Sequence, residues 1–205
     1  MIGVTRRRVL TTTSPPPPPL PYDAKVEWIQ LGGSKYINTG IIPTTAIKFV
    51  VDASFASSTA IYSGAYINNG RFQLGIYSSK FILGLYNKYA YATASLDTSR
   101  HTFILDAPNK EGKFDSETIA LAYTTSPSMT SMTLYIGARN SSGTINTYNN
   151  DMKVYGVQIY DNGTLVFEGV PVRYNGEGYL YDSVSGDMFG NDGTGTITYG
   201  NDIVE

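Results

Sequence analysis

The sequence of 205 residues contains no cysteine and only one histidine and one tryptophan. Without cysteine, neither a disulfide framework nor a thiolate metal site can form. The single histidine, His101, cannot build a histidine metal cluster, and no G-x-S-x-G nucleophile motif or phosphate-binding loop occurs. An E-x-D-x-E run, which would place two glycosidase carboxylates on one face of a strand, is also missing. The sequence therefore indicates a protein that is not an enzyme.

Long apolar runs are missing as well. No segment approaches the ~20 apolar residues of a membrane span, and the net charge of the chain is −2. We therefore expect neither a membrane nor a nucleic acid as a partner. The basic N-terminus is not followed by the run of about 7–15 apolar residues that a secretory signal requires.

The N-terminal segment differs in composition from the rest of the chain. Residues 1–22 hold three of the 15 basic residues, Arg6, Arg7 and Arg8, and none of the 17 acidic residues. Five consecutive prolines, Pro15 to Pro19, favour a stiff polyproline II conformation that loses little entropy on binding. We expect residues 1–23 to be an arm that anchors the protein to other assembly proteins, and residues 24–205 to be one domain. The alternative is a tail that contacts nothing.

From residue 24 onward, apolar and polar residues alternate with the period of half-buried β-strands. The expected strands include 48–55, 71–77, 81–86, 101–106, 133–138, 153–160, 164–168 and 179–181. Their inward-facing residues are expected to be Phe49, Val51, Phe55, Leu74, Ile136, Val157 and Ile159, with Tyr155 on the face of Val157. Short strands with frequent turns and no long helix favour an all-β, antiparallel β-sandwich.

Glycine, asparagine and aspartate crowd the segment 178–196. Asp and Asn side chains bond their own main chain in turns, and Gly accepts positive φ. We therefore interpret four residues as structural turn residues, namely Asp182, Gly186, Asn191 and Gly193. The alternative is an oxygen-rich calcium site that draws on Asp151, Asp182, Asp187 or Asp192, although no EF-hand spacing is present. We expect no metal and no other cofactor.

Three segments in order along the chain resemble a known family. Trp28–Gly40 is similar to the opening motif, Val157–Gly163 to a late strand and hairpin, and Gly178–Gly195 to the closing motif of LamG-like, concanavalin-type jelly-roll domains. These domains are frequent in proteins of gut Bacteroidales and of their phages, including crAss-like phages. The resemblance covers about residues 24–200 and implies a jelly-roll sandwich. It implies no ligand site, because the opening departs from the family pattern at residues 30–32.

Lectin-like sandwiches bind sugars through exposed aromatic rings and polar loops. Tyr86, Tyr89 and Tyr91 surround a turn at residues 87–88 and cannot all enter the core, so we expect them to form a glycan-binding patch. A polar loop at 139–151 adds Asn140 and Asn149 as candidates. The alternatives are cross-strand aromatic packing for the tyrosines and a solvated loop for the asparagines.

We expect a phage virion protein, such as a capsid decoration, head fibre or tail-associated protein, whose jelly-roll head is displayed for adhesion to host glycans. The missing secretory signal favours this interpretation, because phage proteins assemble in the host cytoplasm. We expect the protein to form a homo-oligomer. The alternative is a bacterial secreted or surface carbohydrate-binding module, and the expected localisation is accordingly the virion or the bacterial surface and exterior.

Overall fold

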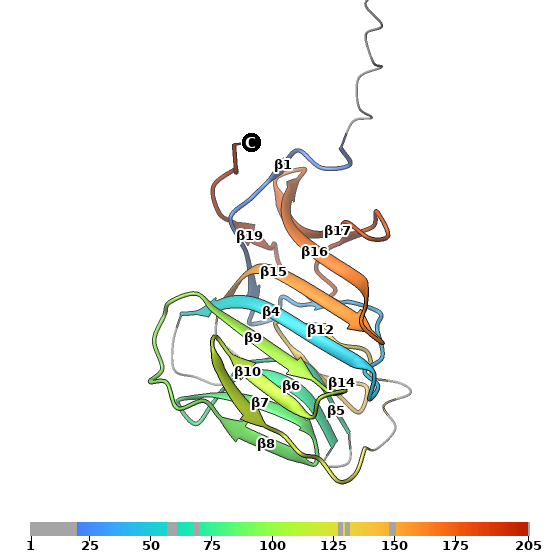
Figure 1. Cartoon of the computed structure of the whole chain (residues 1–205). Helices are drawn as coiled ribbons and strands as arrows, with labels where there is room; N and C mark the ends of the chain where they lie inside the picture. The colour runs from blue at the N-terminus through green and yellow to red at the C-terminus, as the bar shows by residue number, and fades with distance from the viewer. Residues whose placement is uncertain are drawn as a thin grey trace, which may run out of the picture.

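The computed structural model describes residues 20–56, 61–67, 70–126, 129, 132–147 and 151–204, in which every regular element is a strand. Two sheets face each other around one core, so the predicted all-β sandwich is confirmed (Figure 1). The arm residues Arg6, Arg7, Arg8, Pro15 and Pro19 lie outside the described residues, as does Asn149. No helix that could cross a membrane occurs in the described ranges.

The larger sheet follows the order β11-β10-β9-β4-β15-β16-β17-β18, with β1 on β16, β2 on β15 and β19 on β2. Its strands are β1 (Ala24–Lys25), β2 (Ile29–Gly32), β4 (Ile47–Phe55), β9 (His101–Asp106), β10 (Glu111–Phe114), β11 (Glu117–Ala120), β15 (Asp151–Asp161), β16 (Thr164–Tyr174), β17 (Glu177–Asp182), β18 (Met188–Phe189) and β19 (Thr198–Tyr199).

The smaller sheet follows the order β14-β13-β5-β6-β7-β8, with β12 joining β5 to β3. Its strands are β3 (Ile37–Asn38), β5 (Ile61–Ile67), β6 (Gly70–Tyr77), β7 (Lys80–Tyr86), β8 (Lys88–Tyr91), β12 (Tyr135–Ile136), β13 (Arg139–Ser141) and β14 (Thr144–Asn146). The pairing is antiparallel except between β13 and β5, which run parallel. The exception arises because β12 is antiparallel to β5 and the chain then turns back at Gly137, whose φ is 80°. This turn also ends β12 after two residues, well short of the strand expected at 133–138.

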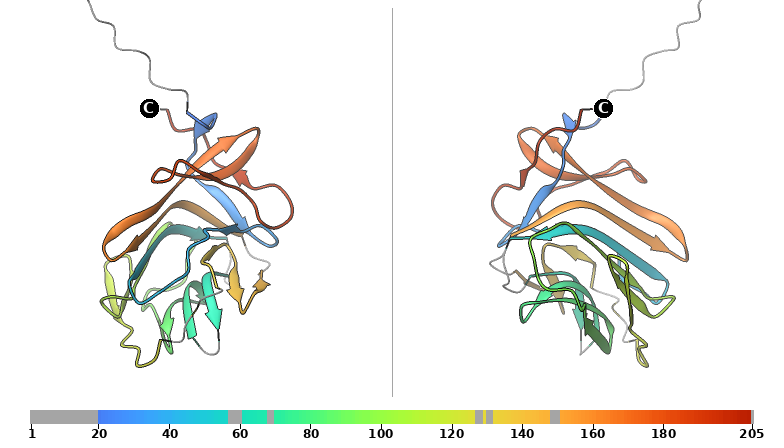
Figure 2. Two further views of the ribbon diagram at one scale, coloured as in Figure 1. Left: turned by 90° about the vertical axis from the view of Figure 1, so that its right-hand side faces the viewer. Right: turned by 60° about the vertical axis from the view of Figure 1, so that its left-hand side comes forward.

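Strand β15 is where the larger sheet forks. One edge of β15 pairs with β4, while its other edge pairs first with β2 and then, from Val157 onward, with β16. The hairpin of β16 and β17 rises from this fork toward the end where both described termini lie (Figure 2). Tyr22, in the expected arm, already packs against Tyr181 of this hairpin, with ring centroids 5.1 Å apart.

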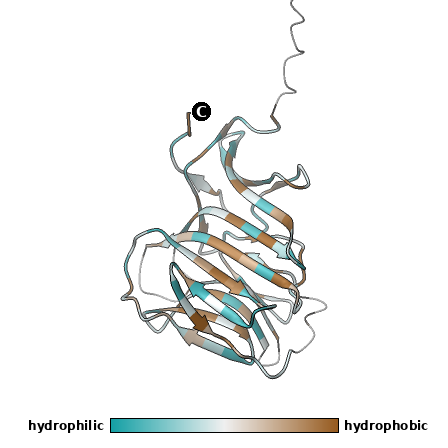
Figure 3. Ribbon diagram, viewed as in Figure 1, coloured by the Kyte–Doolittle hydropathy of each residue, from teal (hydrophilic) through white to brown (hydrophobic). Residues whose placement is uncertain are grey.

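The core lies between the facing sheets, and hydrophobic and hydrophilic residues alternate along its strands (Figure 3). The seven residues expected to face inward are all at most 2% exposed. Four phenylalanines from both sheets form one aromatic cluster, with centroids 4.5–6.2 Å apart, namely Phe55, Phe81, Phe103 and Phe114. Such contacts between rings add to the apolar area that the sandwich buries.

The expectation for Tyr155 is wrong. A bulge between Val154 and Gly156 inserts one residue into β15, so the alternation changes phase there. Met152 and Val154 face the core before the bulge and Val157 after it, while Tyr155 stays partly exposed. Its ring lies on the outer face instead, under the guanidinium of Arg100 at 4.6 Å.

Candidate functional site

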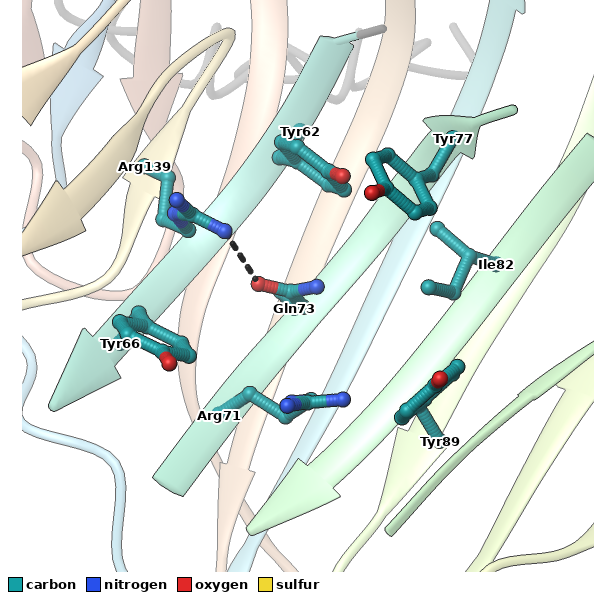
Figure 4. A pocket seen from close by; sticks show the side chains of 8 residues that line it. All are labelled: Tyr62, Tyr66, Arg71, Gln73, Tyr77, Ile82, Tyr89 and Arg139. Carbon is teal, nitrogen blue, oxygen red and sulfur yellow. Dashed lines mark hydrogen bonds between the residues drawn. The ribbon is translucent and has the colours of Figure 1, made fainter. Parts of the chain in front are cut away.

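The outer face of the smaller sheet contains a hollow of about 370 Å³ (Figure 4). Strand alternation explains its lining: Phe72, Leu74 and Ile76 of β6 are fully buried, so the residues between them point outward. Five strands, β5, β6, β7, β8 and β13, contribute the lining side chains, namely Tyr62, Tyr66, Arg71, Gln73, Tyr77, Ile82, Tyr89 and Arg139. The hollow therefore combines four aromatic rings, two cations and one amide.

Glycines form the floor of the hollow. Gly64 and Gly84 flank Gln73 on the two neighbouring strands, and Gly75 lies between Tyr62 and Ile82. Gly64 and Gly75 have φ values of 135° and 143°, and a Cβ at either position would lie 1.9 or 2.1 Å from a backbone carbonyl oxygen. Because these positions carry no side chain, the large residues around them enclose an open space rather than filling it.

Tyrosines hold both arginines in place. The guanidinium of Arg139 lies 5.0 Å from the ring centroid of Tyr62 and 4.8 Å from that of Tyr66, and its Nη1 donates a 3.2 Å hydrogen bond to Oε1 of Gln73. The guanidinium of Arg71 lies 4.5 Å from the ring of Tyr89 and 5.9 Å from that of Tyr66. These cation–π contacts orient the two cations along the hollow.

Gly84 determines how Arg71 lies. A Cβ at Gly84 would come within 2.6 Å of Cδ of Arg71 and 2.9 Å of its Cγ. Without that Cβ, the Arg71 side chain extends flat across the sheet toward Tyr89, as Figure 4 shows. The guanidinium therefore stays inside the hollow.

Two of the three tyrosines predicted for a glycan patch, Tyr89 and Tyr91, lie on this surface. Tyr89 is 50% exposed and lines the hollow. Tyr91 is its neighbour, with ring centroids 5.9 Å apart, and the ammonium of Lys80 lies over the Tyr91 ring. Both tyrosines point outward because they pair with outward positions of β7 at Gly84 and Ile82.

Tyr86 and Asn140 are wrong as surface candidates. Tyr86 is 2% exposed, since a φ of 49° turns its side chain inward onto Tyr123, and burial raises its pKa. Asn140 is 3% exposed because it pairs with the inward position Ala65. Its Oδ1 accepts the Gly143 N–H at 3.1 Å, so this amide stabilises a turn.

No family model matches this chain, and no curated protein matches it. The interpretation of the hollow therefore rests on its own geometry and chemistry.

A second concave region lies on the outer face of the larger sheet, with a volume of about 290 Å³. Its polar groups already have partners within the protein. Arg100 pairs with Asp52 and lies over Tyr155, and Glu168 accepts hydrogen bonds from Gln158 and Ser183. Because Arg100 and Asp52 compensate each other and the Glu168 carboxylate already accepts two hydrogen bonds, this region offers a ligand less than the hollow of the smaller sheet.

The turn interpretation of the segment 178–196 is confirmed. The Asp182 carboxylate accepts main-chain N–H groups of Glu168 at 2.8 Å, Val184 at 3.1 Å and Ser185 at 3.3 Å. Oδ1 of Asn191 accepts the N–H groups of Tyr36 and Gly193, and its Nδ2 donates to the Gly195 carbonyl at 2.7 Å. The bonds of Asp182 hold the local turn to β16, and the bond from Tyr36 fastens the closing segment to a residue 155 positions earlier in the sequence.

The two glycines of this segment serve different purposes. Gly186 has a φ of 83°, the left-handed conformation expected of a turn glycine. Gly193 has no positive φ, but a Cβ there would lie 1.8 Å from the carbonyl oxygen of Ser34. Gly193 is thus required by close backbone approach rather than by its own conformation. No group of three or more metal-ligating side chains is found in the described ranges.

His101 is the first residue of β9 and lies between two carboxylates. Its Nδ1 is 2.7 Å from Asp115 and its Nε2 is 2.9 Å from Asp97, while its ring packs on Phe81 and Phe114. Burial lowers the pKa of His101, the hydrogen bonds to Asp115 and Asp97 raise it, and the net pKa lies above 6.5. Both ring nitrogens are engaged in structural contacts, which disfavours a catalytic base.

Proposed function

We propose that the protein is a non-catalytic module that binds a glycan in the hollow of the smaller sheet. The observation that carries this proposal is the ring of tyrosines around a glycine floor, with an amide and two guanidinium groups between them. Sugar rings present apolar C–H faces that pack on aromatic rings, and hydroxyls that bond amide and guanidinium groups. An open, aromatic surface with a few fixed polar groups suits such a ligand.

The lining favours binding over cleavage. Glycoside hydrolysis generally uses two carboxylates on either side of the scissile bond. The eight lining residues include neither a carboxylate nor a histidine. The guanidinium groups of Arg71 and Arg139 are hydrogen-bond donors and offer no acceptor.

A glycan panel tests this proposal. Wild-type protein should bind at least one panel member, and Tyr89→Ala should weaken that binding by about tenfold, since ring packing of this kind is worth roughly 1–2 kcal/mol. Tyr174→Ala is the matched control, because Tyr174 is also exposed, at 39%, but lies on β16 of the larger sheet. Binding to no panel member at millimolar concentration, or equal loss in both variants, would refute a glycan site in the hollow.

We further propose that this module is displayed on a phage virion, where the N-terminal arm attaches it to other assembly proteins. The resemblance to jelly-roll domains of phage proteins and the basic, proline-rich composition of residues 1–19 support this setting. A bacterial secreted or surface carbohydrate-binding module is the alternative, and the same hollow would serve either.

Deletion of residues 1–19 tests the arm. The cut leaves Tyr22 on Tyr181 and the Asp23 carboxylate on Arg173, so the melting temperature should not change. Incorporation into purified phage particles, measured by mass spectrometry, should be lost. Full incorporation of the truncated protein would contradict an anchoring arm.

A further inference from the structure

We infer that the glycan bound in this hollow is acidic, carrying a carboxylate or sulfate oxyanion that lies between Arg71 and Arg139. The inference rests on the proposed glycan-binding function and adds the chemical class of the ligand. It depends on three features of the hollow: its unpaired charge, its unused hydrogen-bond donors and its lack of acidic groups.

The arginines of the described residues differ in their partners. Arg100 pairs with Asp52, and Arg173 pairs with Asp23 and Asp202. Arg71 and Arg139 form no ion pair with a carboxylate of the described part of the chain; their contacts are tyrosine rings and, for Arg139, the Gln73 amide. The two arginines without an acidic partner are thus the two that line the same hollow.

Both arginines of the hollow also have an unsatisfied donor atom. The Nε atoms of Arg71 and Arg139 are buried and have no hydrogen-bond partner among the described residues. A buried charged donor without an acceptor is costly to the protein. Because the Nε atoms are buried, a ligand meets these guanidinium groups through their Nη atoms. An oxyanion is the ligand group that best offsets the unpaired positive charge, since it accepts charge-assisted hydrogen bonds from a guanidinium.

Gln73 also favours a ligand group that accepts hydrogen bonds. Its Oε1 already accepts from Arg139, which leaves its NH₂ group as the part of the amide that a ligand can use. Gln73 lies between the two arginines in Figure 4, on the strand that also carries Arg71. The centre of the hollow therefore presents donors to the ligand, and the tyrosine rings around it accept the apolar faces of the sugar.

Matched pairs of oligosaccharides test the inference on the full-length protein. The probes are tetragalacturonate with its carboxyl-reduced galactose counterpart, sialyllactose with lactose, and sulfated lactose with lactose, each titrated by calorimetry. We expect the acidic member of at least one pair to bind about tenfold tighter than its neutral counterpart. This preference should shrink in high salt, because salt screens the attraction between exposed charges. Comparison of the carboxylated and sulfated probes shows which oxyanion the hollow selects.

Substitutions locate the effect within the hollow. Arg71→Gln and Arg139→Gln should each abolish most of the preference, because the acidic member of a pair should lose far more affinity than the neutral member. Arg71→Lys, which keeps the charge and removes the guanidinium, should reduce the preference partly and gives a readout if a glutamine variant does not fold. Arg100→Gln is the matched control, because Arg100 also lies over a tyrosine, at 4.6 Å from Tyr155, but on the other sheet. It should leave the preference intact.

The outcomes separate the inference from the function on which it rests. If the acidic and neutral members of every pair bind equally well, the inference is wrong and the glycan site stands. If no probe and no panel glycan binds, the proposed function falls and the inference falls with it. An Arg100→Gln variant that loses the preference as fully as Arg71→Gln would also overturn the inference, since the effect would then come from overall charge.

Discussion

Asp182 allows the most direct test of how the closing segment is held. Its side chain is 2% exposed and accepts three main-chain hydrogen bonds, at 2.8, 3.1 and 3.3 Å. The bond from Glu168 lies within the sheet, whereas Val184 and Ser185 are exposed and their N–H groups can bond water in a variant. Losing one charge-assisted bond costs about 1.5–3 kcal/mol, and the two rehydrated groups add little. Asp182→Ala should therefore destabilise the protein by roughly 2–3 kcal/mol.

Chemical and thermal unfolding measure this change. At about 2–4 °C per kcal/mol for a domain of this size, the melting temperature should fall by roughly 4–12 °C. Asp182→Asn retains one acceptor oxygen and should cost less. Asp187→Ala is the control, because Asp187 lies in the same turn and is exposed, and its substitution should stay within about 0.5 kcal/mol of wild type. If Asp182→Ala also stayed within that margin, the bonds of Asp182 would not be what holds the turn.

Two further predictions concern other parts of the fold. The folded pKa of His101 lies above its unfolded value of 6.5, so its contribution to stability is full below that pH and is lost as the pH rises through the folded pKa. The unfolding free energy should therefore fall as the pH rises above 6.5 and through the folded pKa, and it should fall less in Asp115→Asn. An NMR titration of this single histidine should give a midpoint above 6.5, and a midpoint below it would contradict the assigned contacts. Gly84→Ala should lower the melting temperature much less than Gly75→Ala, because its Cβ would come closest to the Arg71 side chain, whereas a Cβ at Gly75 would lie 2.1 Å from a backbone carbonyl oxygen. Gly84→Ala should still lose glycan affinity, and equal melting temperatures for the two variants would refute this distinction.

The core and the tight turns could be predicted from the sequence because each depends on local pattern. Alternation along β4 places Phe49 and Val51 inside, whatever strand lies beside them. The hairpin turn at Asn162 and Gly163 could also be predicted from the sequence. Both residues have the positive φ that such a turn requires, 48° and 80°. Ser78 and Ser79 likewise turn the chain between β6 and β7 with positive φ.

The errors at Tyr155 and Tyr86 have one physical origin, namely single residues that change the phase of a strand. The bulge at Gly156 moves Tyr155 to the outer face, and the positive φ of Tyr86 turns its ring into the core. Neither event leaves a clear mark in the alternation, because tyrosine is compatible with a buried or an exposed position. Asn140 was misplaced for a related reason: its inward direction follows from pairing with β5, which is far away in sequence.

The hollow itself was beyond prediction from local pattern, because β13 joins β5 only in the folded sheet. Arg139 reaches Gln73 across 66 positions of sequence, so their contact has no local signature. Part of the signal was nevertheless present. The outward-facing residues of β5 are Tyr62, Gly64 and Tyr66. Two large rings on either side of a glycine are not typical of a strand that is buried on that face.

The three floor glycines show which features of the hollow the fold requires and which it does not. Glycine inside a strand weakens a sheet, so each such position needs a reason. Gly64 and Gly75 have one in the backbone, since a Cβ would strike a carbonyl oxygen of the neighbouring strand. Gly84 has no positive φ, and the nearest atoms to its Cβ position belong to the side chains of Arg71 and Tyr89. Glycine at position 84 thus determines the conformation of the Arg71 side chain. The guanidinium of Arg71 faces the hollow, where we place the ligand.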